Sequence, residues 1–374
     1  MTAVGNLLDY LSERGKIPFS VTPFYSVDAL LLAMLAYVDF TGIVPENGGE
    51  VPLRKACRAY FSSHVLDSPW KPRNYAERPA LVLARMSDCP RFAGLTFSHY
   101  TQSRDSDSQF GAVTIRPGDG SLFVAFRGTD ASISGWKESF SLSYLDATPG
   151  QRRALAYLNA VGPLYPQAIQ AAGHSKGGNC AVYAAAFCQP AVRDRVERIF
   201  IFDAPGFRED LAASPEIAAI LPRLVSILPD ASLVGRLLTR VGEGRTVKSN
   251  ARGLLQHDPA TWEIRDGQFA DKPANGMGDY LDQTFRRWLE GLDNETRRSF
   301  TETLFSLLAS AGADSFEEMG LRKRRSAGAI LTALRELPRE KRREALAVIG
   351  ALLRSGGAAA ASCLSRRITG RKDR

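Results

Sequence analysis

The sequence predicts an α/β fold, in which a mostly parallel sheet is covered by helices. Between residues 91 and 290, short β-like apolar runs alternate with helical segments, a pattern typical of parallel sheets. At residues 173–177, a glycine-rich turn lies between a strand-like run and a helix-like run. Hydrophobic residues make up 44% and charged residues 24% of the 374-residue chain, which is the usual mixture of a globular protein.

Residues 1–90 are expected to form a helical N-terminal extension packed on this core. The most apolar run, residues 29–38, has about half of the roughly 20 residues that a transmembrane helix needs. It therefore predicts a buried helix, with Ser26 as a candidate N-cap. The first ten residues show no basic segment followed by an apolar stretch, so we expect no secretory signal and a cytoplasmic protein, with a peripheral membrane location as an alternative.

The α/β core is expected at residues 91–290, where short apolar runs mark the strands of the sheet. Seven apolar runs are expected as strands: residues 94–100, 109–115, 121–126, 168–172, 198–202, 224–228 and 246–249. The turn at residues 117–120, of sequence PGDG, favours a hairpin between the second and third of these strands. Helices are expected at residues 151–161 and 177–188, and the segment 207–222 is expected as either a lid or an amphipathic surface helix.

Residues 291–374 are expected to form a helical, basic C-terminal region with a partly mobile tail. From about residue 277 onward the pattern is helical, with helices expected at residues 280–289, at the end of the core, and at residues 296–308, 326–337 and 339–353. Residues 321–374 hold 15 Lys or Arg against 4 Asp or Glu, so the net charge of +8 belongs to this region. The charge favours a solvated helix face, or binding to an anionic membrane surface or an acidic protein. Nucleic acid is not expected, because no recognisable nucleic-acid module accompanies the charge.

The cysteines argue against a disulfide framework. They are odd in number, form no CxxC pair and lie mostly among apolar residues: Cys57, Cys89, Cys180, Cys188 and Cys363. This pattern predicts reduced, packed thiols. No motif indicates a metal or an organic cofactor.

The turn Gly173-His174-Ser175-Lys176-Gly177 has the Gly-x-Ser-x-Gly pattern of a nucleophile elbow. A strand is expected before it and an apolar helix after it, which is the context in which this pattern exposes a serine on a sharp turn. A helix N-terminus beside Ser175 also favours negative charge. We therefore expect Ser175 to be a nucleophile, against the alternative of a glycine-rich turn with a capping serine.

A serine nucleophile needs a base that is held by an acid, and in such folds the chain order is Ser, then Asp or Glu, then His. Of the four histidines, only His257 follows Ser175 at a distance, in a loop. The acid should end a strand between these two residues, which leaves Asp203 and Asp230. Asp230 is favoured, because an acid on a later strand has more freedom to reach a later histidine loop, and Asp203 is kept as the alternative.

Two backbone amides are expected to form an oxyanion hole. One should belong to Lys176, directly after the serine. The other should follow an earlier strand, where the sequence FRGTD places Thr129. A strand followed by a polar glycine turn is common, so spacing alone supports Thr129 only weakly.

These motifs resemble those of a known family. The pair FRGTD (residues 126–130) and GHSKGGN (residues 173–179) is similar to the class 3 lipase-like α/β-hydrolases, and more closely to the bacterial Mbeg1-like family. Further blocks of the resemblance occur in order over roughly residues 15–290: QFGAV at 109–113, GWKE at 135–138, DAPGF at 203–207, SLVG at 232–235 and QHD at 256–258 with Trp262.

The resemblance implies an α/β-hydrolase fold, a triad of Ser175, Asp230 and His257, and an oxyanion hole at Thr129. Class 3 lipases commonly carry leucine after the serine, whereas this chain has Lys176, so a charged side chain is expected near the mouth of the site. Cleavage of a small-molecule or lipid carboxylic ester through an acyl-enzyme is the expected reaction. The alternatives are a thioesterase or peptidase with the same triad, and an inactive binding or scaffold protein that keeps the fold.

Overall fold

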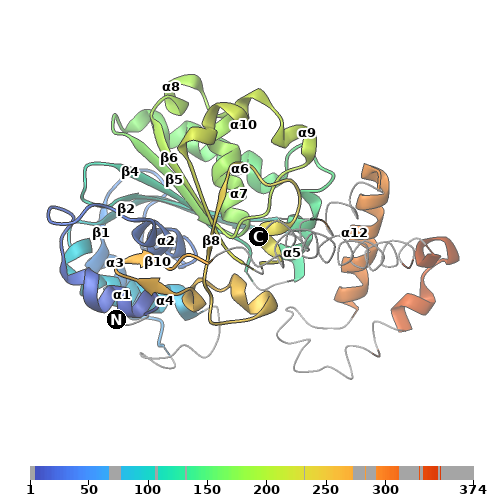
Figure 1. The fold of residues 1–374 in the computed structure, drawn as a ribbon, viewed down its shortest axis with the longest axis horizontal. Helices are drawn as coiled ribbons and strands as arrows, with labels where there is room; N and C mark the ends of the chain where they lie inside the picture. The colour runs from blue at the N-terminus through green and yellow to red at the C-terminus, as the bar shows by residue number, and fades with distance from the viewer. Residues whose placement is uncertain are drawn as a thin grey trace, which may run out of the picture.

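The computed structural model describes residues 5–66, 77–105, 108–130, 133–230, 232–272, 292–310 and 332–343, together with residues 283, 328 and 346. Within these residues, an eight-stranded sheet in the order β1 to β8 forms the centre of the fold (Figure 1). Its strands are β1 (Val51–Pro52), β2 (Thr96–Arg104), β3 (Gln109–Arg116), β4 (Leu122–Phe126), β5 (Ile169–His174), β6 (Val196–Phe202), β7 (Leu224–Pro229) and β8 (Gly244–Val247). β1 to β4 pair antiparallel, and β4 to β8 pair parallel.

The predicted strands are all present, with ends that differ by a few residues. The α/β fold class is therefore confirmed. A small antiparallel pair, β9 (Ile264–Arg265) and β10 (Gln268–Phe269), lies outside the main sheet.

Strand β4 shows why both faces of the sheet need a cover. Its side chains alternate between the two faces, so Leu122, Val124 and Phe126 belong to one hydrophobic core. Phe123 and Ala125 belong to the other core, and none of the five residues is exposed. A strand buried on both sides can only be stable between two layers of helices.

The first layer comes from the connections between parallel strands. It contains α6 (Pro149–Val161), α7 (Lys176–Phe187), α8 (Pro190–Arg193), α9 (Glu209–Ala212) and α10 (Pro215–Ile220). Helix α6 begins with a capping box, in which Thr148 and Gln151 bond each other's backbone amides. The segment predicted as a lid or a surface helix contains the two short helices α9 and α10, and Ile217 and Ile220 of α10 are fully buried against the core.

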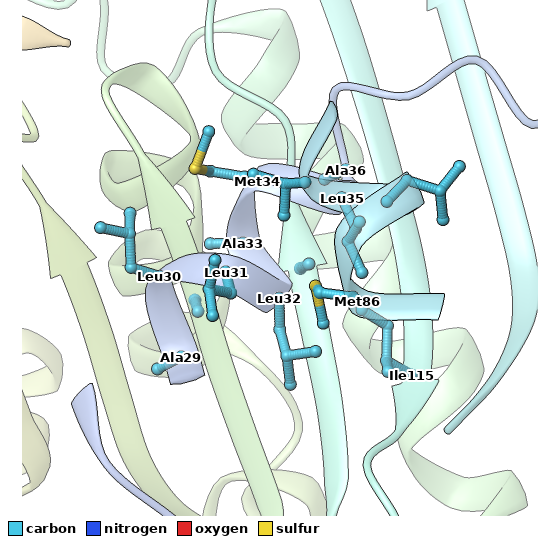
Figure 2. Close-up of a cluster of buried hydrophobic side chains, with 14 of the residues drawn as sticks. Ala29, Leu30, Leu31, Leu32, Ala33, Met34, Leu35, Ala36, Met86 and Ile115 are labelled. Atoms are coloured by element: carbon cyan, nitrogen blue, oxygen red, sulfur yellow. The ribbon is translucent and has the colours of Figure 1, made fainter. Parts of the chain in front are cut away.

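The second layer is the N-terminal region, which contains α1 (Leu7–Glu13), α2 (Ser26–Leu35), α3 (Leu53–Phe61) and α4 (Arg78–Ser87). Figure 1 shows these blue helices on the opposite side of the sheet from α6, α7 and α10. Helix α2 is buried from residue 27 to residue 35 and lies directly across the strands. Figure 2 shows its leucines, with Met86 of α4 and Ile115 of β3 beside them.

A buried ion pair fixes the start of α2. The carboxylate of Asp28 accepts hydrogen bonds from Arg91 Nη2 (2.6 Å) and from the backbone amide of Tyr25 (2.8 Å). The predicted cap, Ser26, is wrong: Tyr25 is the N-cap, and Asp28 bonds its amide. Because Asp28 has several donors, its burial leaves no unpaired charge.

The N-terminal extension therefore lies on the core as a full layer, and its predicted boundary at residue 90 stays a prediction. No helix in the described part of the chain is long and apolar enough to cross a membrane. Cys57, Cys89, Cys180 and Cys188 are buried free thiols, as expected.

In the C-terminal region, α12 (Asn294–Ala309) confirms the helix predicted at residues 296–308. It packs against α5 (Ile133–Ser141), and Figure 1 shows this orange helix beside α5. Phe140 and Phe305 meet edge to face between them, with ring centroids 5.4 Å apart. The other C-terminal helices predicted from the sequence, and most of the basic residues, lie wholly or partly outside the described residues.

Candidate active site

Ser175 is held in a strained backbone conformation between β5 and α7. Its φ is 58° and its ψ is −135°, a region that a non-glycine residue rarely adopts. The backbone amide of Ser175 donates to the carbonyl of Phe202 on the neighbouring strand (2.9 Å), which fixes the turn. The local geometry is therefore the sharp strand-to-helix turn expected of a nucleophile elbow.

The two flanking glycines are required by close packing. A Cβ at Gly173 would lie 2.1 Å from the carbonyl carbon of Gly177. A Cβ at Gly177 would lie 2.1 Å from the carbonyl oxygen of Phe126, at the end of β4. The elbow can therefore form only where both positions lack a side chain.

The sheet register brings three predicted segments to one edge. Gly173 of β5 pairs with Phe126 of β4, and His174 pairs with Phe202 of β6. Residues that follow these positions emerge together at the carboxyl edge, where parallel α/β sheets bind ligands. Thr129, Ser175 and Asp203 all follow a strand at this edge.

His257 pairs with Asp203 at this edge. Its Nδ1 lies 2.7 Å from Asp203 Oδ2, and the Asp203 side chain has no exposed surface. The predicted placement of Asp230 beside His257 is wrong. Asp230 Oδ2 instead lies 3.1 Å from Lys272 Nζ, so the later strand end carries a separate ion pair.

Residues 232–235 hold the Asp203 carboxylate from its other side, a role that was not predicted from the sequence. Its other oxygen, Oδ1, accepts hydrogen bonds from Ser232 Oγ and from the backbone amide of Gly235, the latter at 3.2 Å. A Cβ at Gly235 would lie 2.4 Å from that oxygen, so glycine is required. Ser232 and Gly235 thus hold the carboxylate in place. Their Ser-x-x-Gly spacing is the sequence feature that could have indicated this role.

His174 stabilises the loop that carries His257. Its Nε2 lies 2.9 Å from the carbonyl oxygen of His257, and its Nδ1 lies 3.1 Å from Tyr37 Oη on the N-terminal segment. The two imidazole rings are 4.5 Å apart between centroids. Burial, together with the nearby His257, holds the pKa of His174 well below its usual range, so this ring is neutral at physiological pH.

The Lys176 side chain does not lie at the mouth of the site, contrary to the expectation. Its Nζ pairs with the carboxylate of Glu138 and bonds the carbonyl of Gln109, and only 1% of the side chain is exposed. Glu138 also accepts hydrogen bonds from the backbone amides of Gln109 (3.1 Å) and Gly150 (2.8 Å). The lysine therefore ties α7 to α5 and β3, and only its backbone remains available to the site.

Thr129 is buried and lies next to the elbow. A Cβ on the preceding residue, Gly128, would lie 3.1 Å from Ser175 Cβ. Thr129 Oγ1 is 3.2 Å from Ser139 Oγ and 3.4 Å from the carbonyl oxygen of Gly135, both on α5. These contacts fix the loop after β4 beside Ser175.

Ser175 Oγ makes no hydrogen bond to His257, although both residues are described. Among the described residues, no group of three or more His, Cys, Asp or Glu side chains could hold a metal ion.

A serine elbow at the carboxyl edge of a mostly parallel sheet, with an Asp–His pair on the following loops, defines the α/β-hydrolase class of fold. The chain belongs to the Mbeg1-like family, whose model matches residues 86–306. The crystal structure of M37 lipase matches with a TM-score of 0.36 at 15% identity, covering 57% of this chain and 70% of that one. No curated protein matches the chain.

Proposed function

We propose that this protein is a serine hydrolase that cleaves a carboxylic ester. The observation that carries the proposal is the position of strained Ser175 at the same sheet edge as the His257–Asp203 pair, whose atoms are 2.7 Å apart. Strained backbone is retained where function needs it, and a buried carboxylate on a histidine is the usual means of orienting a base.

In the proposed reaction, His257 removes the proton of Ser175 Oγ, which attacks the carbonyl carbon of the ester. Asp203 holds the Nδ1–H tautomer of His257 and stabilises the imidazolium. The imidazolium then protonates the leaving alcohol, and water repeats the sequence to release the acid. The base is thus Nε2 of His257.

The backbone amides of Thr129 and Lys176 are the proposed oxyanion donors. Each follows a strand of the same parallel pair, and the Lys176 amide is the first of α7, where the helix dipole favours negative charge. Losing one such donor costs about 2.7–4 kcal/mol of transition-state stabilisation. The buried Glu138–Lys176 pair would hold this amide in place.

Labelling with a fluorophosphonate probe tests the proposal. We expect wild-type protein to be labelled, Ser175→Ala and His257→Ala to be unlabelled, and Ser98→Ala, a buried serine on β2, to be labelled like wild type. Folding of each variant is checked by circular dichroism. Folded wild-type protein that takes no label would favour the scaffold alternative.

Substrate class is then decided by rates on matched short esters, thioesters and amides. The proposal requires the ester to be cleaved fastest and the activity to vanish in Ser175→Ala. Faster thioester or amide cleavage would instead support the thioesterase or peptidase alternative.

A further inference from the structure

We propose that Tyr37 is a positioning residue of the active site, which acts on His257 through His174. The inference rests on the proposed hydrolase function and extends it to the N-terminal layer. Tyr37 follows α2 and lies outside residues 86–306, the part of the chain that the family model matches. A residue of the second layer thus completes a site whose other residues come from the core.

Tyr37 is held in place by the packing of α2. This helix is buried from residue 27 to residue 35 and packs on β5, the strand that leads to Ser175. Directly after the helix, the backbone amide of Tyr37 donates to the carbonyl of Met34 (3.1 Å), which continues the helical turn. The Tyr37 hydroxyl therefore reaches the elbow from a fixed backbone.

Both ring nitrogens of His174 have a partner, and the partners determine which nitrogen carries the proton. Nε2 lies 2.9 Å from the carbonyl oxygen of His257, which can only accept, so Nε2 is the donor. Burial and the nearby His257 hold the pKa of His174 low, so the ring is neutral and its Nδ1 is an acceptor. Tyr37 Oη, 3.1 Å away, donates to that nitrogen.

The same hydroxyl lies where the loop after β4 meets the elbow. Tyr37 Oη is 3.3 Å from the carbonyl oxygen of His174, the residue before Ser175. A Cβ at Gly128 would lie 2.0 Å from Tyr37 Oη and 3.1 Å from Ser175 Cβ. Tyr37 therefore packs between the loop that carries Thr129 and the residue before the proposed nucleophile.

The hydrogen bond from Tyr37 matters for the charge that His257 acquires in the proposed reaction. The rings of His174 and His257 are 4.5 Å apart between centroids, so a proton on His174 would oppose the imidazolium that forms on His257. By donating to Nδ1, Tyr37 occupies the position at which His174 would take that proton. The titratable groups that face His174 include Tyr37 and His257, and Asp203 lies beyond His257. Tyr37 thus keeps His174 neutral and bonded to the loop of His257.

The first test removes only the hydroxyl. Tyr37→Phe should lower kcat on a short p-nitrophenyl ester about tenfold with KM unchanged, because the lost hydrogen bond acts on the base and not on substrate binding. Tyr100→Phe is the matched control, since it removes a hydroxyl that donates to Gln102 Oε1 (2.9 Å) from another buried tyrosine. Its kcat should stay within about twofold of wild type. Thermal unfolding checks that both variants fold.

The second test asks whether Tyr37 acts through His174. In a double-mutant cycle, Tyr37→Phe should lower kcat about tenfold in the wild type but less than about twofold in His174→Leu, where no imidazole links Tyr37 to His257. An equal loss in both backgrounds, or no loss in the wild type, would overturn the positioning role and leave the hydrolase proposal standing.

The third test does not depend on activity. Full-length protein with isotope-labelled histidine is titrated with acid and followed by nuclear magnetic resonance. In Tyr37→Phe the pKa of His174 should rise, because the neutral ring loses its donor, and the imidazole signals of His257 should shift. Tyr100→Phe should change neither. This result supports the positioning role even if no ester is cleaved and the proposed function fails, whereas unchanged His174 and His257 signals in Tyr37→Phe would overturn it.

Discussion

Replacing Asp203 by asparagine should nearly abolish hydrolysis while leaving the fold intact. Asp203 Oδ1 accepts from Ser232 and from the amide of Gly235, so the asparagine oxygen would keep that position. The amide nitrogen would then face His257 Nδ1, 2.7 Å away in the wild type. A donor there forces Nδ1 to accept, which moves the histidine proton to Nε2 and removes the base that Ser175 needs.

The expected loss in kcat is on the order of 10³–10⁴-fold, or roughly 4–5.5 kcal/mol of activation free energy, which is the usual effect of imposing the wrong tautomer. Asp230→Asn is the matched control. It weakens the ion pair with Lys272, a partly exposed side chain, and touches neither His257 nor Ser232. We expect its activity to stay within about threefold of wild type, because Asp230 pairs with Lys272 and not with His257.

The assay is kcat and KM on a short p-nitrophenyl ester, with thermal unfolding of each variant as the check on folding. Both asparagine variants should melt as single transitions. Full activity in Asp203→Asn, or a loss in Asp230→Asn as large as 10³-fold, would refute the assignment of Asp203 as the acid and return that role to Asp230.

Three further outcomes are expected. Lys176→Met should lower the free energy of unfolding in urea by about 3–5 kcal/mol, because it leaves Glu138 as a buried carboxylate without its cation; an unchanged midpoint would contradict this. Gly177→Ala should abolish fluorophosphonate labelling, whereas Gly94→Ala, whose Cβ would meet nothing nearer than 3.8 Å, should label normally; equal labelling would argue against the elbow packing. Since the pKa of His174 is lowered, the unfolded chain binds a proton below about pH 6.5 that the folded chain does not, so stability should fall by up to about 1.4 kcal/mol per pH unit on acidification. His174→Gln should reduce the dependence of the free energy of unfolding on pH, measured by urea titration between pH 5 and 7. An unchanged dependence would mean that other groups cause it.

The strands and the elbow were predictable because local patterns determine them. Apolar runs of the right length mark strands that are buried on both faces, and β4 is such a run. The glycines of the elbow indicate close packing, and in the structure a Cβ at Gly173 or at Gly177 would lie only 2.1 Å from a backbone atom. In both cases the information lies within a few neighbouring residues.

The aspartate that pairs with His257 could not be chosen in the same way. Asp203 and Asp230 end neighbouring parallel strands, which lie only about 4.8 Å apart, so chain order alone leaves both within reach of a later loop. Residues 232–235 fold back onto Asp203 and hold its Oδ1, while Oδ2 lies 2.7 Å from His257 Nδ1; both are long-range contacts that chain order does not reveal. The buried lysine was missed for a related reason: hydropathy places Lys176 at the surface, whereas Glu138, 38 residues earlier, provides its partner inside.

The position of α2 has a consequence for how this chain reaches its native state. The helix is buried from end to end against β4, β5 and β6, yet strand β6 lies about 170 residues later in the chain, so the loop that must close is long. At a synthesis rate of roughly 5–20 residues per second, α2 is made about 10–30 seconds before β6, the last of its partner strands. During that interval the sheet that its leucines cover is incomplete, so part of their apolar surface stays accessible until β6 joins. The residues that complete the core of the folded protein are thus an apolar surface that could associate wrongly while the chain is being made.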